Sequence, residues 1–563
     1  MSKKAIVFSL VVLFFLGLGY LIFNKVYLSN SSVDQYRFVF IIFLIIIGGN
    51  YFIFANKLKS DTANSGKKSE HRKNSFYHKS IFLIILLSIL VIAVYNFNNI
   101  GFLDTDEIRL FYDAKLITEG GIPFVDFEAR SPPLIYLLAG IILIFGNSVY
   151  NFYILSILLT LISSILIYIL GSKLFSKEAG LFSMFLYGFS PLIFNLLYVK
   201  TQSFEIPLIL GAAILYLKFL EKRSVKLVLL SIFLINIAVL IRESTLFILP
   251  FLFIIDFFES KDTKNNMLKR IVMFSLGSFV GYAIFHIGMI LAFPESSRWL
   301  IGPLPAPEYY QSQSFERLKH IVPYLSVFTT VLLSSFLFYF ISVLGDIKRS
   351  RTLQRQLALF VSLLVLIAFY VYSYFTLGFW PEYLIETLPM TSLILGPALL
   401  FLNWGYKEKI VACLCVLITV LLIMVSSYNS YVYYKEYKGV YNIEGVENVS
   451  NYLRETSHTN TTLFAGSPIY SYVSDVSSIL PLSHSYYDQK SVEIITDYLK
   501  NNPPTYIIED PYLKDYLAYN EFKNFFKTNY SLEKEYSGIK FKKKYNYKVY
   551  RYQNQTLLPL IRK

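Results

Sequence analysis

GFLDTDEIRLFYDAKLITEGGIPFVDFEARSPP, residues 101–133, is a polar stretch in a chain dominated by long apolar runs. It carries seven carboxylates and only three basic residues, although the whole protein has a formal net charge of +14. Most of the apolar runs are about 17 to 25 residues long, enough to cross a hydrocarbon core of about 30 Å. An acidic segment beside the bilayer in a basic chain needs a reason. We expect it to carry the catalytic carboxylates of an enzyme that works at the membrane surface.

Composition predicts a polytopic α-helical membrane protein. The 563 residues are 55% hydrophobic and only 16% charged, whereas a β-barrel would show short segments of alternating polarity. The two cysteines, Cys413 and Cys415, lie inside an apolar run, so we predict neither a structural disulfide nor a metal cluster. The positive charge is read as a topology signal, and no nucleic-acid partner is expected.

The apolar runs give the order of the spans. Residues 5–23 are interpreted as an uncleaved helix, with a cleavable signal peptide as the alternative. A second span, 38–55, is followed by a polar, basic loop, 57–79, which we expect to be flexible and cytoplasmic. Later runs cover 80–97, 150–172, 179–198, 204–220, 226–241, 245–258, 270–292, 323–345, 357–376, 384–403 and 408–428.

The run 132–146 is only about 15 residues long, a length that favours a re-entrant or interfacial segment. If it does not cross, the loops predicted to be cytoplasmic contain 25 Lys and Arg residues and the outer loops contain 10. A full crossing would swap the later loops and remove most of this bias. The positive-inside rule therefore predicts about 13 spans, with the N-terminus inside and the C-terminus outside.

Three regions follow from this layout. Residues 1–79 contain two added spans and the basic loop, and residues 80–428 form the main membrane domain. Within the latter, outer loop 98–133 is acidic, and outer loop 293–322, rich in proline and aromatic residues, is placed to cover a surface site. Residues 429–563 are polar and rich in Tyr and Lys. There, TTLFAG (461–466), TYIIED (505–510) and YKVYRY (547–552) predict strands, and SVEIITDYLKNN (491–502) predicts a helix of a small extracytoplasmic α/β domain.

The acidic loop and its flanks resemble a known family. Asp106-Glu107 opens the loop, and FEARSPPL, residues 127–134, closes it. In this pattern the chain resembles the polytopic glycosyltransferases of the C superfamily, in the protein O-mannosyltransferase and aminoarabinose (lipid A) transferase branch. Their first large outer loop begins with an Asp-Glu pair and ends in an acidic residue followed by Lys-Pro-Pro-Leu.

The resemblance spans roughly residues 80–430. VLIRES, 239–244, lies where relatives carry a basic residue at the outer end of a span, and FWPEYLIETLP, 379–389, resembles an aromatic segment that leads into a helix with proline. One departure is clear. Two extra residues separate Glu128 from the prolines, and Arg130 stands near the position of the family's lysine.

This resemblance implies an enzyme that transfers a hexosyl or pentosyl unit from a polyprenyl-phosphate sugar. Asp106 would take the proton from the acceptor as the new bond forms. Glu107 or Asp104 would orient the acceptor or stabilise charge on the sugar. Arg242 and Arg130 are the candidates for binding the donor phosphate, because the guanidinium fork matches phosphate oxygens.

Alternative interpretations stand beside these roles. The three acids near residue 105 also suit a solvated helix start, and Arg242-Glu243 also suits a hairpin turn at the outer surface. Further candidates for substrate contact lie around the expected site, and Glu205 among them is equally typical of a helix-start acid. These candidates are Glu128, Glu205, Glu243, Arg298, His320, Glu382 and Tyr383.

The expected partners are a polyprenyl-phosphate sugar, a lipid, glycan or protein acceptor, and membrane lipids, in the plasma (inner) membrane with the acidic loop outside. No cofactor or divalent metal is predicted. The rival function is a transporter or flippase of lipid-linked sugars, and a third is a catalytically inactive subunit. Transporters often carry internal repeats and charges near the bilayer midplane. The acids at the interface and the lack of a visible repeat favour an enzyme. The C-terminal domain would either select the acceptor or stabilise the assembly.

Overall fold

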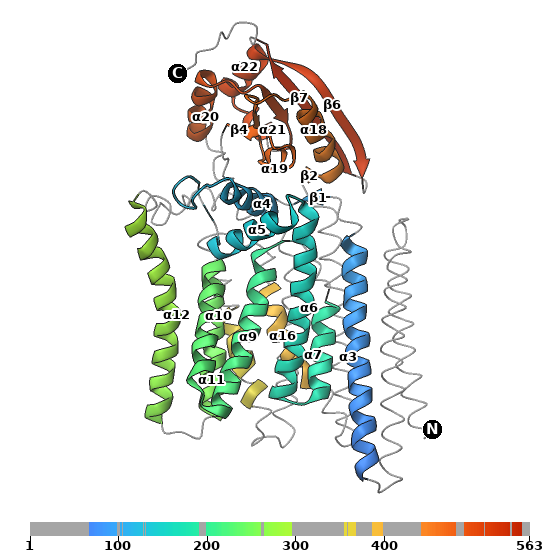
Figure 1. Ribbon diagram of the computed structural model, residues 1–563, viewed down its shortest axis with the longest axis vertical. Coiled ribbons are helices and arrows are strands. Elements are labelled where there is room, and N and C mark those ends of the chain that lie inside the picture. The colour runs from blue at the N-terminus through green and yellow to red at the C-terminus, as the bar shows by residue number, and fades with distance from the viewer. Residues whose placement is uncertain are drawn as a thin grey trace.

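The computed structural model describes residues 67–97, 102–103, 105–127, 129, 131–190, 199–259, 264–294, 354–356, 358–366, 385–397, 441–479, 489–511, 513–540 and 543–553. The first two expected spans, outer loop 293–322 beyond residue 294, and both cysteines lie outside this part of the chain. The described residues form a bundle of long helices, a layer of two helices across one end of it, and a domain above that layer (Figure 1).

The bundle contains the long apolar helices. They are α3 (Lys67–Phe97), α6 (Val149–Leu174), α7 (Lys177–Gly188), α9 (Thr201–Lys222), α10 (Val225–Ile241), η1 (Glu243–Ile248), α11 (Leu249–Glu259), α12 (Lys264–Ala292) and α16 (Leu388–Leu395). Of the described helices, α6, α9 and α12 are long and apolar enough to cross a membrane. The structure thus matches the expected polytopic helical class, and the total of 13 spans stays a prediction.

Burial separates the central helix of the bundle from the peripheral one. The apolar window of α9 is 61% buried, but that of α12 is only 11% buried. An apolar helix that buries so little of itself against protein suits contact with lipid. α9 packs against both α6 and α10, so residues on its inner face are shielded on several sides.

Small residues allow some helices to approach closely. Gly171 on α6 and Gly180 on α7 face each other so tightly that a Cβ on either would clash with the backbone of the other helix. Such contacts are typical of membrane helices, where packing replaces the hydrophobic effect as the source of association. On the same side, Gly396, just beyond α16, meets Ser183 of α7.

The start of α3 corrects one expectation. The loop 57–79 was expected to be flexible, but α3 begins at Lys67 and continues to Phe97. Lys and Glu are good helix formers and can extend an apolar helix by several polar turns. His78 on this extension lies 2.8 Å from Glu178 at the start of α7, which fixes α3 to the bundle.

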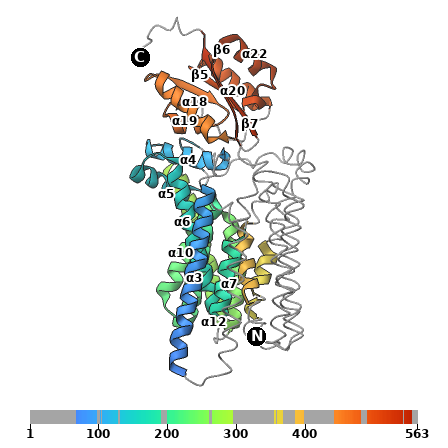
Figure 2. The same ribbon diagram turned by 90° about the vertical axis from the view of Figure 1, so that its right-hand side faces the viewer.

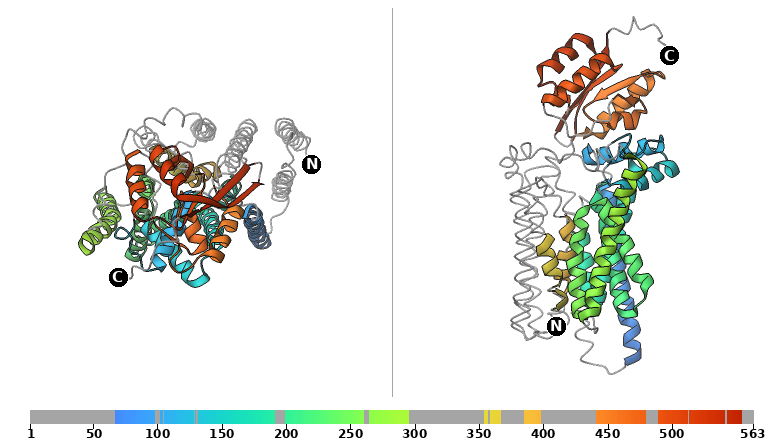
Figure 3. Two further views of the ribbon diagram at one scale, coloured as in Figure 1. Left: turned by 90° about the horizontal axis from the view of Figure 1, so that it is seen from above. Right: turned by 90° about the vertical axis from the view of Figure 1, so that its left-hand side faces the viewer.

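Two helices lie across the end of the bundle. α4 (Thr105–Thr118) and α5 (Pro132–Phe145) cross the ends of the long helices rather than run along them (Figures 1 and 3). Pro132 begins α5, and Gly146 ends it with a φ of 84° that disfavours other residues. The short run 132–146 therefore does not cross the bundle, as its length predicted.

The basic connections lie at the opposite end from α4 and α5. Both the α6–α7 connection, flanked by Lys173 and Lys177, and the α9–α10 connection, with Lys222 and Arg223, are found there (Figure 1). All four basic residues belong to loops that the sequence assigns to one side. That this side is the cytoplasm stays a prediction of the positive-inside rule.

The C-terminal part forms an α/β domain around a five-stranded sheet. Its elements are β2 (Tyr441–Asn442), α18 (Ile443–Thr456), β3 (Thr462–Ala465), α19 (Ile469–Ser474), β4 (Ser477–Ser478), α20 (Gln489–Asn501), β5 (Tyr506–Glu509), α21 (Leu513–Tyr516), α22 (Asn520–Asn529), β6 (Tyr530–Lys540) and β7 (Lys543–Tyr552). The strand order is β4-β3-β5-β7-β6, with β3 parallel to β4 and β5 and the other pairs antiparallel. All three expected strands are present. Strand β6, whose residues are mostly polar and exposed, was not foreseen.

Alternation along the strands covers both faces of this sheet. Leu463 and Ala465 pack with α18 and α19, whereas Phe464 between them packs with α20, α21 and α22. Side chains with a period of two point to opposite faces, so each strand contributes to two cores. The core on the α18–α19 side is continuous with apolar residues of α4, α5 and α6.

The domain is therefore docked on the α4–α5 layer (Figure 2). β1 (Phe102–Leu103), just before α4, pairs antiparallel with β2 of the domain. Lys115 of α4 is buried, and its Nζ donates to Ser471 O at 2.9 Å and to Asp475 Oδ1 at 2.8 Å. Phe111 stacks on Phe152 of α6 and lies 5.8 Å from the Tyr472 ring. Strand pairing, a buried lysine and aromatic packing together hold α4 against the domain.

Candidate active site

Arg242 joins three segments of the bundle. It follows α10 with an extended backbone, at φ −160° and ψ 123°. Its Nε donates to Ser244 Oγ at 3.0 Å, and its Nη1 donates to Thr201 Oγ1, at the start of α9, at 3.3 Å. The same Nε contacts Glu386 Oε1 and lies 3.9 Å from Glu205 Oε2. The structure thus places Arg242 in an ion-paired cluster and not on a solvated turn.

The cluster forms where several helices begin or end. Glu205 is in the second turn of α9, and Glu386 comes two residues before α16, where the positive end of the helix dipole favours an acid. Arg242 follows the negative end of α10. The side chains of Glu205 and Glu386 are only 1% and 5% exposed, and that of Arg242 is 19% exposed. Low exposure limits solvent screening and strengthens these interactions.

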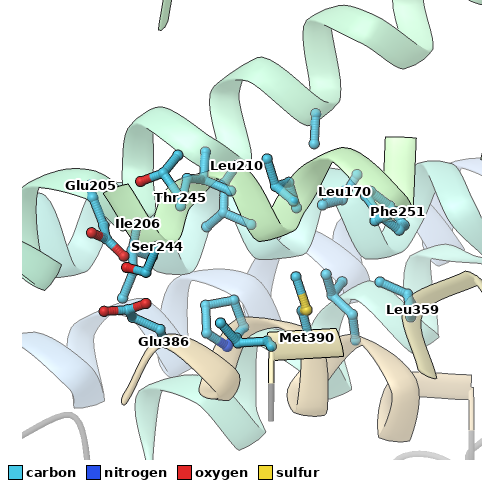
Figure 4. Close-up of a pocket in the computed structure, with 16 residues that line it drawn as sticks. Leu170, Glu205, Ile206, Leu210, Ser244, Thr245, Phe251, Leu359, Glu386 and Met390 are labelled. Carbon is cyan, nitrogen blue, oxygen red and sulfur yellow. The ribbon is translucent and has the colours of Figure 1, made fainter. Parts of the chain in front are cut away.

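An apolar cavity begins at the two glutamates. Figure 4 shows the carboxylates of Glu205 and Glu386 and the hydroxyl of Ser244 together at one end, with aliphatic and aromatic side chains beyond them. The empty volume is about 560 Å³, including its open side. The other lining residues come from α6, α9, η1, α11, residues 358–366 and α16; they are Leu170, Ile206, Ile209, Leu210, Ala213, Thr245, Ile248, Phe251, Leu359, Leu366, Pro389, Met390 and Leu393.

The shape and polarity of this cavity suit an amphiphile. An apolar chain would be shielded along the aliphatic lining, and a polar head would lie at the end formed by Glu205, Ser244 and Glu386, where Glu386 contacts Arg242. Of the described residues that line the cavity, none belongs to α4.

Glu107 is placed in α4 and is fully buried. Its Oε2 accepts a hydrogen bond from the Tyr153 hydroxyl of α6 at 3.3 Å. Asp106 is in the first turn of the same helix, but its side chain lies outside the described part of the structure.

Three other acids of the acidic loop have structural partners. Asp113 lies 3.8 Å from Arg109, one helical turn away, and Glu119 lies 3.8 Å from Lys115. Asp126 Oδ2 accepts from the Ile122 backbone N–H at 2.7 Å and closes a turn. The excess of carboxylates in residues 101–133 is thus partly used to build the loop.

Tyr112 can be excluded as a base in this layer. Burial, and then the neighbouring Glu119 and Asp113 carboxylates, raise the pKa of Tyr112 to about 12. The phenol therefore stays protonated near neutral pH, where it donates a hydrogen bond and does not accept a proton.

The end of the acidic loop is tied to the backbone beside Arg242. Ser131, before α5, has a positive φ of 55°, which is uncommon for a residue other than glycine. Its hydroxyl donates to the carbonyl of Ile241 at 2.6 Å. Ile241 and Phe204, neighbours of Arg242 and Glu205 in the chain, also pack in the cluster that includes the core of α4 and α5. The Arg242 cluster and the acidic layer are adjacent parts of one region.

Comparison with known proteins finds a family match for part of the chain and a similar fold for most of it. Residues 129–289 match the family of dolichyl-phosphate-mannose-protein mannosyltransferases. The fold is similar to an oligosaccharyltransferase from Archaeoglobus fulgidus in its apo form, with a TM-score of 0.52 and 11% identity over 77% of this chain and 70% of that one. It is also similar to ArnT from Cupriavidus metallidurans in the apo state (TM-score 0.51, 8% identity, 84% of this chain and 98% of that one). For ArnT bound to undecaprenyl phosphate, the TM-score is 0.50 and the identity 9%, over 83% of this chain and 97% of that one. No curated protein sequence matches the chain.

Residues 129–289 are thus similar to the mannosyltransferase family, and the solved structures share the fold of this chain. The segment that matches the mannosyltransferase family begins at Ala129 and includes Arg130, Glu205 and Arg242, whereas Asp106-Glu107 lies before it.

Several expected site residues lie outside the described residues. These are Asp104, Glu128, Arg130, Arg298, His320, Glu382 and Tyr383. Glu243 is described in the backbone of η1 only. Of the remaining candidates, the structure brings Arg242 and Glu205 together and places Glu107 against α6, in the adjacent layer.

Glu386 and Thr201 are cluster members that the sequence did not single out. In FWPEYLIETLP, a segment that resembles one of the family, the sequence indicated Glu382 and Tyr383 as candidates for substrate contact. The signal for Glu386 was its place directly before an apolar run with a proline, where an acid suits a helix start. Thr201 had no such signal, because its role depends on the approach of α10 to α9.

Proposed function

We propose that this protein is an integral-membrane glycosyltransferase. It moves one sugar from a polyprenyl-phosphate donor to an acceptor on the extracytoplasmic face of the plasma membrane. The donor tail lies in the apolar cavity, Arg242 binds the donor phosphate, and Asp106 is the general base. Arg130, in the loop that Ser131 ties to Ile241, is the second candidate for the phosphate.

The observation that carries this proposal is an arginine in contact with a glutamate at the polar end of an apolar cavity, beside an acidic layer. Arg242 contacts Glu386, which lines that cavity together with Glu205. A lipid phosphate is an amphiphile with this order of polarity, and a guanidinium binds phosphate oxygens in a bidentate manner. The acceptor, coming from the opposite side of the α4–α5 layer, would meet the Asp106 carboxylate.

The proposed reaction is a single displacement at the anomeric carbon. A lone pair of the acceptor hydroxyl or amine forms the new bond to the sugar. The bond between the anomeric carbon and the phosphate oxygen breaks, and its electron pair stays on the polyprenyl phosphate. Asp106 takes the proton of the acceptor, and Arg242 stabilises the charge that grows on the leaving phosphate. One displacement inverts the anomeric configuration.

Relatives support the class of donor. The matching family is described by its use of dolichyl-phosphate mannose, and the similar ArnT was crystallised with undecaprenyl phosphate. Both ligands are polyprenyl phosphates, so the proposal for this chain is the same lipid class with an undefined sugar.

In this proposal the docked C-terminal domain positions α4, the helix that carries Asp106. Strand β1 ends at Leu103, directly before the Asp104–Glu107 segment, and pairs with β2. Lys115 fixes the other end of α4 to α19. The domain therefore holds the base-bearing helix in position from two points.

A transfer assay in membranes tests the function. Wild type and Asp106→Asn are each given a panel of polyprenyl-phosphate sugars, and glycosylated products are separated and identified. Loss of a general base lowers the transfer rate by about 10²- to 10⁴-fold. An Asp106→Asn rate equal to that of wild type removes the assigned base.

The same assay separates enzyme from transporter. Proteoliposomes loaded with a fluorescent polyprenyl-phosphate sugar report both the glycosidic product and the leaflet of the lipid. Movement of intact donor between leaflets, with no product for any sugar and acceptor tested, would reject transfer and favour a flippase.

A further inference from the structure

Two carboxylates lie near the one guanidinium of Arg242 among the described residues. Glu386 Oε1 contacts the guanidinium Nε, and Glu205 Oε2 lies 3.9 Å from the same atom. Both carboxylates are nearly inaccessible, and both line the cavity. With both acids ionised, the three side chains carry a net charge of −1, in a place where low exposure weakens screening.

A lipid phosphate that approaches Arg242 would meet this negative charge. Phosphate oxygens bind best when they occupy the N–H groups of the guanidinium directly. In the structure the Nε edge is held by Glu386 and Ser244. The phosphate can take this edge only if a carboxylate moves away from it.

Glu386 is better placed to move than Glu205. Glu205 belongs to α9, the most deeply buried of the three spanning helices, and its side chain is 1% exposed. Moving it would disturb the packing of α9 against α6 and α10. Glu386 belongs to a single 3₁₀ turn, residues 385–387, before the eight-residue helix α16. Figure 4 shows its carboxylate at the polar end of the cavity, level with Ser244, where a lipid head would lie.

We propose that Glu386 is a displaceable counter-ion of Arg242. It pairs with the guanidinium when the site is empty, and it yields its place to the phosphate of an incoming polyprenyl phosphate. This inference rests on the proposed function and deepens it, because it assigns a specificity role to a residue of the donor site.

The exchange has two consequences for the reaction. Lipids whose head group binds arginine no better than a carboxylate, such as fatty acids, gain nothing by displacing Glu386. Polyprenyl phosphate, the leaving group, also has to compete with Glu386 after transfer, so the same residue speeds product release. A neutral side chain at residue 386 should therefore tighten the binding of the lipid phosphate.

Binding measurements on the purified full-length protein in detergent test this. The probes are undecaprenyl phosphate and, as the uncharged comparison, undecaprenol. Close charge pairs at interfaces couple by about 1.5 kcal/mol or more, so Glu386→Gln should bind undecaprenyl phosphate at least about tenfold more tightly than wild type. Its affinity for undecaprenol should not change, and dissociation of the phosphate should slow by a similar factor.

Two further variants control the experiment. Glu221→Gln removes a carboxylate from the exposed Lys173–Glu221 pair at the other end of the bundle, and should leave both affinities unchanged. Glu386→Asp keeps the charge but withdraws it by one methylene, and should give a smaller tightening than Glu386→Gln. Thermal unfolding of each variant in the same detergent confirms that it is folded. If Glu386→Gln does not fold, the binding measurement on Glu386→Asp replaces it.

The outcomes separate the inference from the proposed function. If wild type binds undecaprenyl phosphate but Glu386→Gln binds it equally or more weakly, Glu386 only positions Arg242 and the exchange is wrong. Equal tightening toward undecaprenol would attribute the effect to the cavity and would also reject the exchange. If wild type binds no undecaprenyl phosphate and transfers no sugar, the proposed function itself fails, and the exchange fails with it.

Discussion

Arg242 and Arg270 pair with buried carboxylates near opposite ends of α9, and they do so differently. Arg270 of α12 donates to a single acid, Asp256 of α11, from Nε at 3.0 Å and from Nη2 at 2.9 Å. The Tyr216 hydroxyl of α9 adds a third donor to Asp256 at 3.1 Å. Arg242 instead faces two acids with its Nε, and both acids open onto a cavity.

In our proposal, this is the difference between a structural pair and a binding site. At Arg270, one guanidinium meets one carboxylate, which accepts three hydrogen bonds. At Arg242, one guanidinium meets two carboxylates, and an apolar cavity begins at those carboxylates. A site prepared for a ligand keeps interactions that the ligand can replace, whereas a structural pair keeps none.

The largest expected effect is on the structural pair. Asp256→Ala leaves the Arg270 charge buried without this partner, so the protein should lose about 3–5 kcal/mol of unfolding free energy. Thermal and denaturant unfolding in detergent measure the loss, and transfer per folded molecule should stay at the wild-type level.

Glu221→Ala is the matched control for that variant. It removes an exposed carboxylate at the same end of the bundle, 2.9 Å from Lys173, and such pairs contribute about 0–1 kcal/mol. If Asp256→Ala loses no more unfolding free energy than Glu221→Ala, the Arg270–Asp256 pair does not stabilise the fold, and the proposed difference between the two arginines is wrong.

Arg242→Lys should have the next largest effect, and it should fall on donor binding. Lysine keeps the charge but lacks the planar fork. Loss of one or two charge-assisted hydrogen bonds corresponds to about a tenfold to hundredfold weaker affinity for undecaprenyl phosphate. Equilibrium binding measures it directly.

Arg270→Lys is the counterpart of that change. It should lower the unfolding temperature and leave the affinity for the lipid phosphate unaltered. The distinction between the two arginines is lost if both lysine variants weaken the lipid to the same extent.

A smaller effect is expected from the docking contact of the C-terminal domain. Lys115→Met removes two hydrogen bonds to α19 while it keeps an apolar stem in the buried position. Because α4 would be held less firmly, kcat should fall about tenfold, which is equivalent to one or two net hydrogen bonds. Donor affinity should be unchanged, since α4 does not line the described cavity.

Lys500→Met tests whether this effect is local. Lys500 pairs with Asp497 and Glu521 on the side of the domain covered by α20 and α22, away from α4. It should give wild-type kcat. If the domain only stabilises the assembly, Lys115→Met should lower the unfolding temperature and leave kcat at the wild-type level, as Lys500→Met does.

The sequence predicted the elements whose pattern is local. The apolar runs placed α6, α9, α10 and α12 within a few residues, and the short run 132–146 was correctly kept from crossing. Alternation identified β3, β5 and β7. The exposed strand β6 lacks an apolar side, so it carries no such pattern, and its pairing with β7 supplies the stability that its sequence does not show.

The cluster at Arg242 was only half predictable. Arg242 stood out because a charged pair between two apolar runs is expensive if buried and because VLIRES resembles a family segment, and Glu205 stood out because it follows a predicted outer loop. Their partner Glu386 lies 144 residues beyond Arg242 in the chain, and contacts at such separations depend on how the helices pack. Similarly, a count of acids in residues 101–133 could not reveal that Asp113, Glu119 and Asp126 serve the loop itself.

The last prediction tests whether Glu107 belongs to the candidate active site, like Arg242, or only stabilises the fold, like Asp256. The Tyr153 hydroxyl, which donates to Glu107 Oε2 at 3.3 Å, can be removed by Tyr153→Phe with almost no change in shape. A neutral hydrogen-bond donor to a buried carboxylate contributes about 1 kcal/mol or less at this length. If Glu107 belongs to the site, this should appear as a transfer rate up to about fivefold lower, with the unfolding temperature near that of wild type.

Tyr187→Phe, at a fully buried tyrosine of α7, provides the comparison for loss of a hydroxyl away from the acidic layer. A lower unfolding temperature for Tyr153→Phe with an unchanged transfer rate would assign Glu107 a structural role, the same kind of role as Asp256 has. Asp106 would then be the remaining carboxylate of the Asp-Glu pair with a role in transfer. A slower rate at unchanged stability would instead assign both acids to the site, because a donor that only supports the fold has no means to alter the reaction and leave unfolding untouched.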